Sequence, residues 1–268
     1  MYGMRYNAFT TIFLVLCLVA AGCCHKPTMR EMGIVLDTLT TTGGVPLTDS
    51  VASPRCDVDI QLITLANKEY APVNDSLLRS GILSPEYLSL SDVSIEPKVA
   101  VDSFIKRYCD DYRTFYAGLF SDEDDADAAT IGFKLRTSIE EGKDSTLCYK
   151  AFITSRQGDI STDYTVCRNI DLTHKRLLTL DDIFVHGAEK GLSNAITHQL
   201  MRQSANKTET ELRQAGFFVN SEPYPTSNFI LGDKSITFVY VTGEIADREK
   251  GEINVEVKYS DIKHLMKR

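Results

Sequence analysis

The strongest constraint on the fold lies near the C-terminus, where apolar and polar side chains alternate along short segments. Residues 228–231 and 235–241 flank a glycine-led turn, and residues 253–259 alternate strictly between apolar and polar. Period-two alternation is typical of strands with one buried face, and turn residues between such strands predict a hairpin or meander. A short helix is expected to follow, with residues 259–261 as its cap and acidic first turn.

The preceding part of the chain also carries strand and helix patterns. Residues 97–119 form the longest predicted helix, because Pro97 favours a first turn and apolar side chains recur three or four apart. Strands are predicted at 56–64, 130–139, 147–155 and 159–170, and shorter helices at 74–81, around 192–200 and at 209–215. The predicted fold class is α+β: antiparallel sheets packed by a long helix and several short helices, in two intimately associated halves.

The patterns divide the chain into four segments. Residues 1–22 are predicted to be a lipoprotein signal peptide, and residues 23–55, rich in Thr, Ser, Gly and Asp, a disordered tether. Residues 56–168 and 169–268 are predicted to be an N-terminal and a C-terminal α+β domain. A chain of 268 residues with 43% hydrophobic side chains is long and apolar enough for such a body.

The N-terminus predicts export and lipid attachment. Arg5 supplies a positive region, and the apolar run at 13–19 is too short to span a bilayer as a mature helix. The Ala-Ala-Gly-Cys segment at 20–23 resembles the lipobox of bacterial lipoproteins, in which Cys23 receives the lipid, although that pattern prefers Leu where Ala20 stands. The expected address is the bacterial cell envelope, on the periplasmic or surface face of the outer membrane, with the lipid as membrane anchor. An ordinary cleaved signal with an incidental cysteine is the alternative.

An even number of cysteines in the body fits an oxidising compartment. They are Cys56, Cys109, Cys148 and Cys167, and four cysteines permit three pairings. A hairpin that turns at residues 157–158 places Arg156 opposite Asp159 and Cys148 opposite Cys167, which predicts a disulfide between the latter two. Four buried free thiols are the alternative, and the pairing of Cys56 with Cys109 is left open.

Charge and motif content exclude several functions. The formal net charge is -8 with scattered basic residues, whereas nucleic-acid binding needs a basic stripe. No cofactor is predicted, because dinucleotide and phosphate-binding motifs are absent from the sequence, and no metal, because it has no CxxC and its histidines are far apart. The acidic run at 121–127 departs from the EF-hand at Ala126 and Asp127, which favours a solvated loop.

Several blocks together resemble a known family. They are Leu178-Thr179-Leu180-Asp181-Asp182-Ile183-Phe184, Asn228-Phe229, Glu244-Ile245-Ala246, Gly251 and Val257-Lys258-Tyr259-Ser260. They look like a family of exported bacterial domains of unknown function that forms the C-terminal part of the extracytoplasmic region of the anti-sigma factor RsiV. Residues 56–152 are similar to the partner domain found beside it in RsiV and in a peptidoglycan deacetylase.

The resemblance implies an extracytoplasmic binding module, because this region of RsiV binds lysozyme. A basic muramidase would suit an acidic domain. The chain departs from the family at Gly243 and at residues 247–250, where tyrosine is common. It also has a signal in place of the membrane span and sigma-binding segment of RsiV.

Three functions follow as hypotheses. The favoured one is a non-catalytic binding or sensing module for a protein, such as lysozyme, or for peptidoglycan or another envelope glycan. Its predicted binding residues are Tyr224 and the loop Asp247, Arg248, Glu249 and Lys250, since exposed loops on a rigid sheet often carry recognition. A hydrolase or modifying enzyme of envelope polysaccharide would use Asp181, Asp182 and His186 for acid–base chemistry. A structural lipoprotein of an envelope complex is the third. The most useful structural observation would be a pocket or groove lined by polar residues of both halves.

Overall fold

The structure is a computed structural model that describes residues 29–83, 95–119 and 126–267. Ile34–Arg268 forms one compact unit, and Met1–Gly33 is a separate one. The predicted signal peptide and the predicted lipidation site Cys23 lie outside the described residues, as does most of the acidic run at 121–127.

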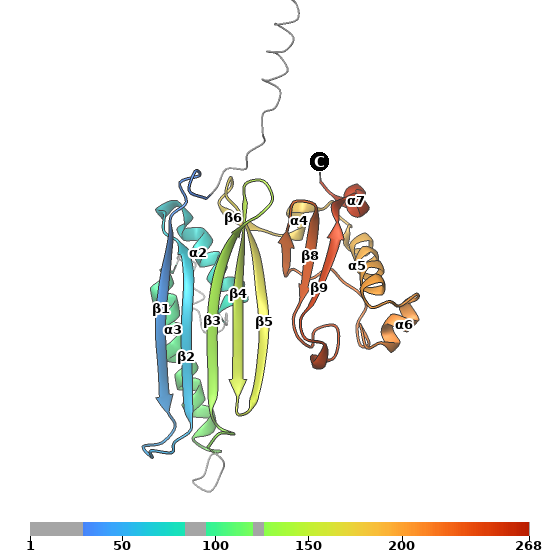
Figure 1. Cartoon of the computed structure of the whole chain (residues 1–268). Helices are drawn as coiled ribbons and strands as arrows, with labels where there is room; N and C mark the ends of the chain where they lie inside the picture. Colours follow the sequence, from blue (N-terminus) through green and yellow to red (C-terminus); the bar gives the residue numbers. More distant parts are fainter. Residues whose placement is uncertain (1–28, 84–94, 120–125, 268) are drawn as a thin grey trace, which may run out of the picture. The chain divides into compact units, whose positions relative to one another are not determined.

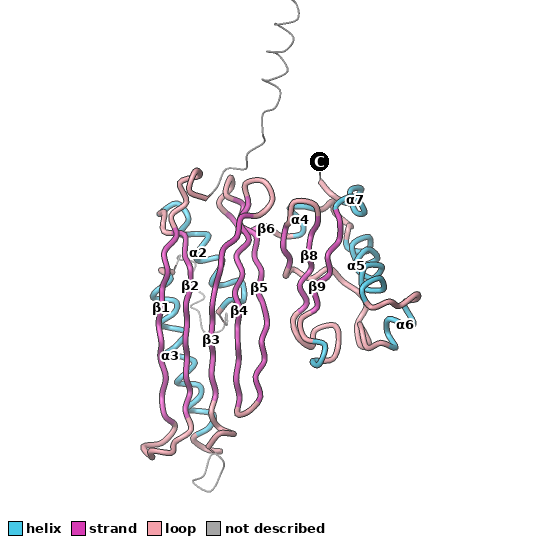
Figure 2. Tube along the Cα trace, viewed as in Figure 1, coloured by secondary structure: helices cyan, strands magenta, loops and turns pink. Residues whose placement is uncertain are grey.

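The described part of the chain is an α+β fold with two sheets (Figures 1 and 2). The larger sheet contains, in spatial order, β1 (Leu36–Pro46), β2 (Arg55–Leu65), β3 (Ile131–Glu141), β4 (Thr146–Gln157), β5 (Ile160–Asp171) and β6 (Arg176–Leu178). The smaller sheet contains β7 (Phe229–Leu231), β8 (Ser235–Tyr240) and β9 (Ile253–Lys258). The helices are α2 (Ala71–Leu77), α3 (Pro97–Tyr116), α4 (Leu180–Ile183), α5 (Glu189–Gln203), α6 (Glu209–Gln214) and α7 (Tyr259–Ile262). Single helical turns are η1 (Lys68–Tyr70), η2 (Leu78–Ile82), η4 (Arg248–Lys250) and η5 (Lys263–Leu265).

Strand β1 lies within the segment predicted to be a disordered tether. Residues predicted to be disordered form β1, which pairs antiparallel with β2 along its whole length, from Leu36 opposite Leu65 to Pro46 opposite Arg55. Thr-rich strands are common, and the Thr content that suggested a linker is compatible with an edge strand. The tether prediction of 23–55 is therefore wrong over β1.

The connection from β2 to β3 makes the larger sheet mixed. β2 and β3 pair in parallel, and the chain between them contains α2 and α3. A parallel pair needs such a crossover, whereas the remaining neighbours are joined as antiparallel strands. The α+β fold class is confirmed, and the expectation of purely antiparallel pairing is wrong at this one pair.

Helix α3 packs along β1 and β2 (Figure 1). Its buried side includes Val101, Phe104 and Tyr112, as its apolar periodicity predicts. The approach is close: a Cβ on Gly43 of β1 would lie 2.4 Å from Cγ2 of Ile105, so a larger residue there would force the Ile105 side chain to move. Phe115, which the same periodicity assigns to the buried side, is 63% exposed.

The register of the β4–β5 hairpin differs from the predicted one by two residues. Gln157 pairs with Ile160, which leaves Gly158 and Asp159 as the turn. Gly158 has a φ of 59°, the left-handed value that a type II′ turn requires at its first central residue. The prediction instead centred the turn one residue earlier.

The corrected register separates the two cysteines of this hairpin. Cys148 lies opposite Asn169 and Cys167 opposite Lys150, so the two thiols share a face but occupy diagonal positions. Both are buried thiols, and the observed register does not place them opposite each other, as the predicted Cys148–Cys167 disulfide assumed. Burial raises the pKa of Cys148 to about 11 and that of Cys167 to about 12.

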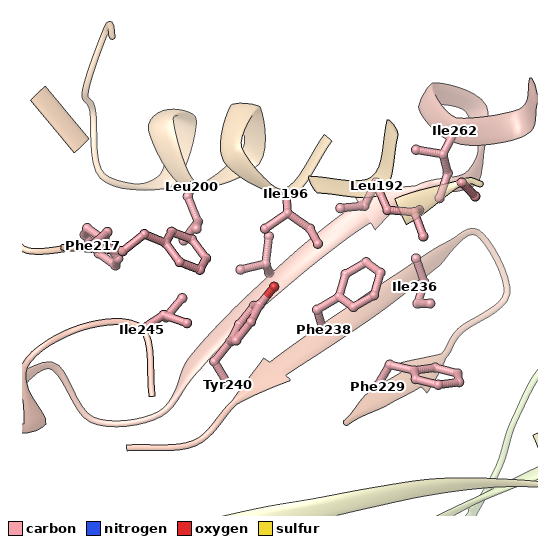
Figure 3. Close-up of a cluster of buried hydrophobic side chains, with 14 of the residues drawn as sticks. Leu192, Ile196, Leu200, Phe217, Phe229, Ile236, Phe238, Tyr240, Ile245 and Ile262 are labelled. Carbon is pink, nitrogen blue, oxygen red and sulfur yellow. The ribbon is translucent and has the colours of Figure 1, made fainter. Parts of the chain in front are cut away.

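The smaller sheet has its own apolar core under α5 (Figure 3). Side chains of α5 point toward those of β8: Leu192, Ile196 and Leu200 face Ile236, Phe238 and Tyr240. Each fully buried side chain of this size contributes about 1.5–3 kcal/mol relative to an exposed one. The predicted hairpin, its period-two pattern and the helix over it are confirmed.

The predicted domain boundary is displaced. A division between residues 168 and 169 would cut β5, whose last paired residues continue to Asp171 and join β6. The larger sheet therefore ends at Leu178, and the residues after it build the second sheet and its helices.

Candidate functional site

Two asparagines join the larger sheet to the smaller one. The Asn228 side chain accepts a hydrogen bond from Cys167 N (2.6 Å) and donates to the carbonyl oxygens of Thr165 (2.8 Å) and Val239 (2.9 Å). A side-chain amide has the donor and acceptor of a peptide group, so Asn228 replaces a neighbouring strand along part of the β5 edge.

Asn169 makes the reciprocal contact from β5. Its side chain donates to Phe229 O (2.8 Å) and accepts from Leu231 N (3.0 Å). These two hydrogen bonds satisfy backbone groups at the edge of β7. Asn169 is 2% exposed and Asn228 8% exposed. We call these two residues and the backbone groups they bond the asparagine seam. It orients the smaller sheet against β5, because buried amides are costly to leave unpaired.

Toward the start of β5 the contacts come from the 242–252 segment. Thr242 Oγ1 donates to Asp163 O (3.1 Å), and Thr165 N donates to Glu252 Oε2 (3.1 Å). Each of these two side chains makes one hydrogen bond to the strand, whereas each amide of the asparagine seam makes two or three. A hollow is left between the strand and the segment.

This hollow is the candidate site, and we call it the groove. It has a volume of about 770 Å³ and is lined by residues 152–154 of β4, residues 160–165 of β5, and Thr242, Arg248 and residues 251–252. Polar residues of both halves therefore meet there. Its volume falls within the range of about 300–1,000 Å³ that is typical of ligand pockets.

One aromatic ring and several polar groups define the chemistry of the groove. Phe152 is 47% exposed, although its strand neighbours Ala151 and Ile153 are buried on the other face. Thr154 Oγ1 donates to Asp163 Oδ1 (2.6 Å), which orients that carboxylate. Arg248 Nη1 lies 3.4 Å from Thr162 Oγ1, so its guanidinium stands beside the groove.

The predicted binding loop is divided between the groove and other positions. Arg248 lines the groove, while Asp247 lines a second hollow of about 340 Å³ together with Gly216 and residues 218–221 and 243–246. The Lys250 ammonium lies 5.2 Å from the centre of the Phe217 ring, a cation–π contact. Glu249 is exposed within the η4 turn.

Tyr224 braces the loop and does not line the groove. Its hydroxyl donates to Glu244 Oε1 (2.6 Å), and the other oxygen of Glu244 accepts from Val241 N (2.8 Å). Burial, followed by the neighbouring Glu244 carboxylate, raises the pKa of Tyr224. The ring is in edge contact with Phe218 and Tyr240. Tyr224 is therefore a positioning residue for the segment that forms one wall of the groove.

The residues predicted for acid–base chemistry lie elsewhere. Asp182 completes a capping box with Thr179 at the start of α4, and its Oδ1 lies 2.7 Å from Arg176 Nη2. The Arg176 hydrogen bond, with those from Thr179, holds the pKa of Asp182 well below its usual range. Asp181 and His186 are exposed and line none of the hollows described above. The carboxylate of Asp182 is thus engaged in helix capping, as its first-turn position indicates.

Two further properties concern the described residues alone. Residues 29–83, 95–119 and 126–267 contain no group of three or more His, Cys, Asp or Glu side chains arranged to hold a metal ion. The same ranges contain no helix that combines the length and apolarity needed to cross a membrane.

The most informative site residues were not selected by sequence reasoning. Phe152 could have been selected from the sequence, because it is an aromatic residue on the polar face of its strand, between Lys150 and Thr154. Asn169 could also have been noticed, because asparagine is depleted in strands yet stands at the end of the strand predicted at 159–170. Nothing in the sequence marks Asp163 or Glu252, since a carboxylate on or next to a strand is ordinarily a solvated side chain.

These features define an α+β body in which a six-stranded mixed sheet is held edge-on, by side-chain amides, to a three-stranded sheet covered by helices. Residues 181–260 match the family described as "Protein of unknown function (DUF3298)". No curated protein matches the chain.

Two solved structures share the fold. A crystal structure of a DUF3298 family member from Bacteroides fragilis is 19% identical, with a TM-score of 0.74, and the match covers 88% of this chain and 94% of that one. A DUF3298 family protein from Pseudomonas aeruginosa is 14% identical, with a TM-score of 0.59, and the match covers 87% and 94%. At these identities the comparison establishes the α+β architecture along most of the chain.

Proposed function

We propose that the protein is an exported, lipid-anchored module of the bacterial cell envelope that binds an envelope glycan without chemically changing it. The groove between the β4–β5 hairpin and the 242–252 segment is the proposed binding site. The observation that carries this proposal is that polar residues of both halves line one hollow. The lipobox-like segment ending at Cys23 supports the address.

The composition of the groove favours a polyhydroxylated ligand. The exposed ring of Phe152 offers an apolar platform for the C–H face of a sugar, and the hydroxyls of Thr154, Thr162 and Thr242 can accept or donate around its rim. Arg248 and Glu252 add a cation and an anion on the same wall, which suits a glycan that carries amide and carboxylate groups. Peptidoglycan fragments meet this description.

Non-catalytic binding is favoured by the roles of the candidate acid–base groups. Asp182 is engaged by Arg176 and Thr179, and Asp181 and His186 lie outside the groove. The hydrolase hypothesis therefore gains no support from the geometry.

A basic protein of the lysozyme kind is the second candidate ligand. It is favoured by the net charge of -8 and by the resemblance to the RsiV extracytoplasmic region. Such a partner would contact the acidic surface as a whole, so its binding would fall steeply with added salt. A glycan seated on Phe152, with Arg248 as its main charged contact, would bind with a much weaker salt dependence.

The test is calorimetric titration of the full chain in detergent with soluble peptidoglycan fragments and, separately, with lysozyme. Saturable glycan binding, reduced at least tenfold by Phe152→Ala or Arg248→Ala, is expected. Phe115→Ala is the matched control for the first variant, because Phe115 is an exposed aromatic on α3 that does not line the groove. Arg202→Ala is the control for the second, because Arg202 is an exposed arginine on α5.

Three results would contradict the proposal. The first is saturable binding that Phe115→Ala weakens as much as Phe152→Ala does. The second is tight binding of lysozyme alone, which would favour the protein ligand. The third is release of shortened glycan products during the titration, which would show catalysis.

A further inference from the structure

The thiols of Cys56 and Cys109 lie close together between the larger sheet and α3. Their Sγ atoms lie 3.9 Å apart. Cys56 is 0% exposed and Cys109 is 5% exposed. The two residues come from different elements, β2 and α3, and are separated by 53 positions in the sequence.

The surrounding structure holds these two elements in fixed positions. Cys56 lies at the start of β2, where it pairs with Val45 of β1 and Ile131 of β3. Its side chain points to the same face as Val58 and Ile60, which α3 covers. Cys109 lies on the buried side of α3, between Phe104 and Tyr112. A disulfide needs about 2 Å between the sulfurs, so rotation of the two side chains by a modest angle suffices.

We propose that Cys56 and Cys109 are a disulfide site that links β2 covalently to α3 in the mature protein. The oxidant is a disulfide of the thiol–disulfide exchange class, such as the oxidised carriers of exported compartments. The thiolate of one cysteine attacks the oxidant disulfide and releases one carrier thiol. The thiolate of the second cysteine then attacks the mixed disulfide and releases the second carrier thiol. Two protons and two electrons leave the pair, and one carrier disulfide becomes two thiols.

Burial determines when the bond forms. Desolvation raises the pKa of both thiols, so the reactive thiolate is scarce once α3 has packed on the sheet. Exchange also requires the carrier to reach the sulfur, and neither side chain is accessible in the folded protein. The bond therefore forms while the chain folds, and packing of α3 then protects it from reductants.

The second cysteine pair provides an internal comparison. Cys148 and Cys167 lie diagonally across the β4–β5 hairpin rather than facing each other, and a bridge there would require the strands to shift. Cys56 and Cys109 are in direct contact. The geometry therefore favours one bridge, between Cys56 and Cys109, with Cys148 and Cys167 left as thiols.

Peptide mapping tests the pairing directly, because trypsin places each body cysteine on a separate peptide. The full chain is reduced, unfolded, refolded in a glutathione redox buffer with detergent, alkylated and digested without reductant. The expected product joins the peptide of residues 56–68 to that of residues 108–113, while residues 144–150 and 157–168 are recovered singly and alkylated. Recovery of residues 56–68 and 108–113 as separate alkylated peptides, or linked to other cysteines, would overturn the proposal.

Variants separate the bond from general effects on folding. The Cys148→Ala/Cys167→Ala variant should keep the 56–109 link. Reductant should lower the Tm of that variant by roughly 10 °C and leave the Tm of Cys56→Ala/Cys109→Ala unchanged. Equal sensitivity of the two variants to reductant would contradict the assignment. In the cell, the oxidant would be supplied by the exported compartment, so the proposal rests on the export in the proposed function. The refolding experiment supplies its own redox buffer and does not depend on export or on ligand binding.

Discussion

The two ends of one edge of β5 make different contacts with the rest of the chain. Near Thr165 and Cys167, the amide of Asn228 bonds the strand directly, and Asn169 does the same for β7. Near Thr162 and Asp163, single side-chain contacts such as that of Thr242 join the 242–252 segment to the strand, and the groove lies between them. We call the end at Asn228 and Asn169 the closed end and the end at the groove the open end. Substitutions at the closed end should lower the free energy of unfolding, and substitutions at the open end should weaken ligand binding.

The largest expected effect is that of Asn228→Ala at the closed end. It removes three side-chain hydrogen bonds and leaves buried backbone groups unpaired, which we expect to lower the free energy of unfolding by about 3–4 kcal/mol. Urea denaturation followed by circular dichroism measures the change. The exposed Asn220→Ala should lie within about 0.5 kcal/mol of the wild type. A loss below about 1 kcal/mol for Asn228→Ala would mean that the seam contributes little cohesion.

Asn169→Ala should have the next largest effect. It removes two hydrogen bonds to the edge of β7, and we expect a loss of about 2–3 kcal/mol. Because both asparagines hold one interface, the double variant should be less destabilised than the sum of the single variants by about 1 kcal/mol. Strict additivity in the same denaturation experiment would show that the two amides act independently.

Asp182→Asn should have a smaller effect that depends on pH. Loss of the charged capping box and of the Arg176 contact should cost about 1 kcal/mol at pH 7. The pKa of Asp182 is depressed in the folded state, so its stabilisation is present above the unfolded pKa of about 4 and is lost as the pH falls through the folded pKa. The stability gap between wild type and Asp182→Asn should therefore narrow below about pH 4. A gap that widens in acid would contradict this role.

The smallest effect on stability is expected at the open end. Phe152→Ala should change the free energy of unfolding by less than about 0.5–1 kcal/mol, because the ring is 47% exposed. The same substitution should weaken glycan binding at least tenfold. If Phe152→Ala instead destabilises the protein as Asn228→Ala does, the ring packs structurally and the distinction between the two ends fails.

The sequence was most informative where one local pattern determines one local structure. The alternation at 235–241 and 253–259 predicts β8 and β9, and the spacing along 97–119 predicts α3. Each of these depends on neighbouring residues, and burial of one face follows from the period of the pattern.

Errors arose where the structure depends on partners that are distant in sequence. β1 is stabilised by β2, so its Thr- and Gly-rich composition did not identify it as a strand. The β4–β5 register follows from the left-handed conformation of Gly158, and a shift of two residues moves Cys148 away from Cys167 without changing its face.

The sequence by itself therefore determined the α+β class, the C-terminal hairpin with its helices, and the position of the loop that contains Arg248. Only the tertiary structure decided that Cys56 meets Cys109, that Asn228 meets the edge of β5, and that Arg248 shares a groove with Phe152. These pairs are separated by many residues, and no periodic pattern relates them. Their proximity follows from the packing of α3 on its sheet and of the two sheets at the asparagine seam.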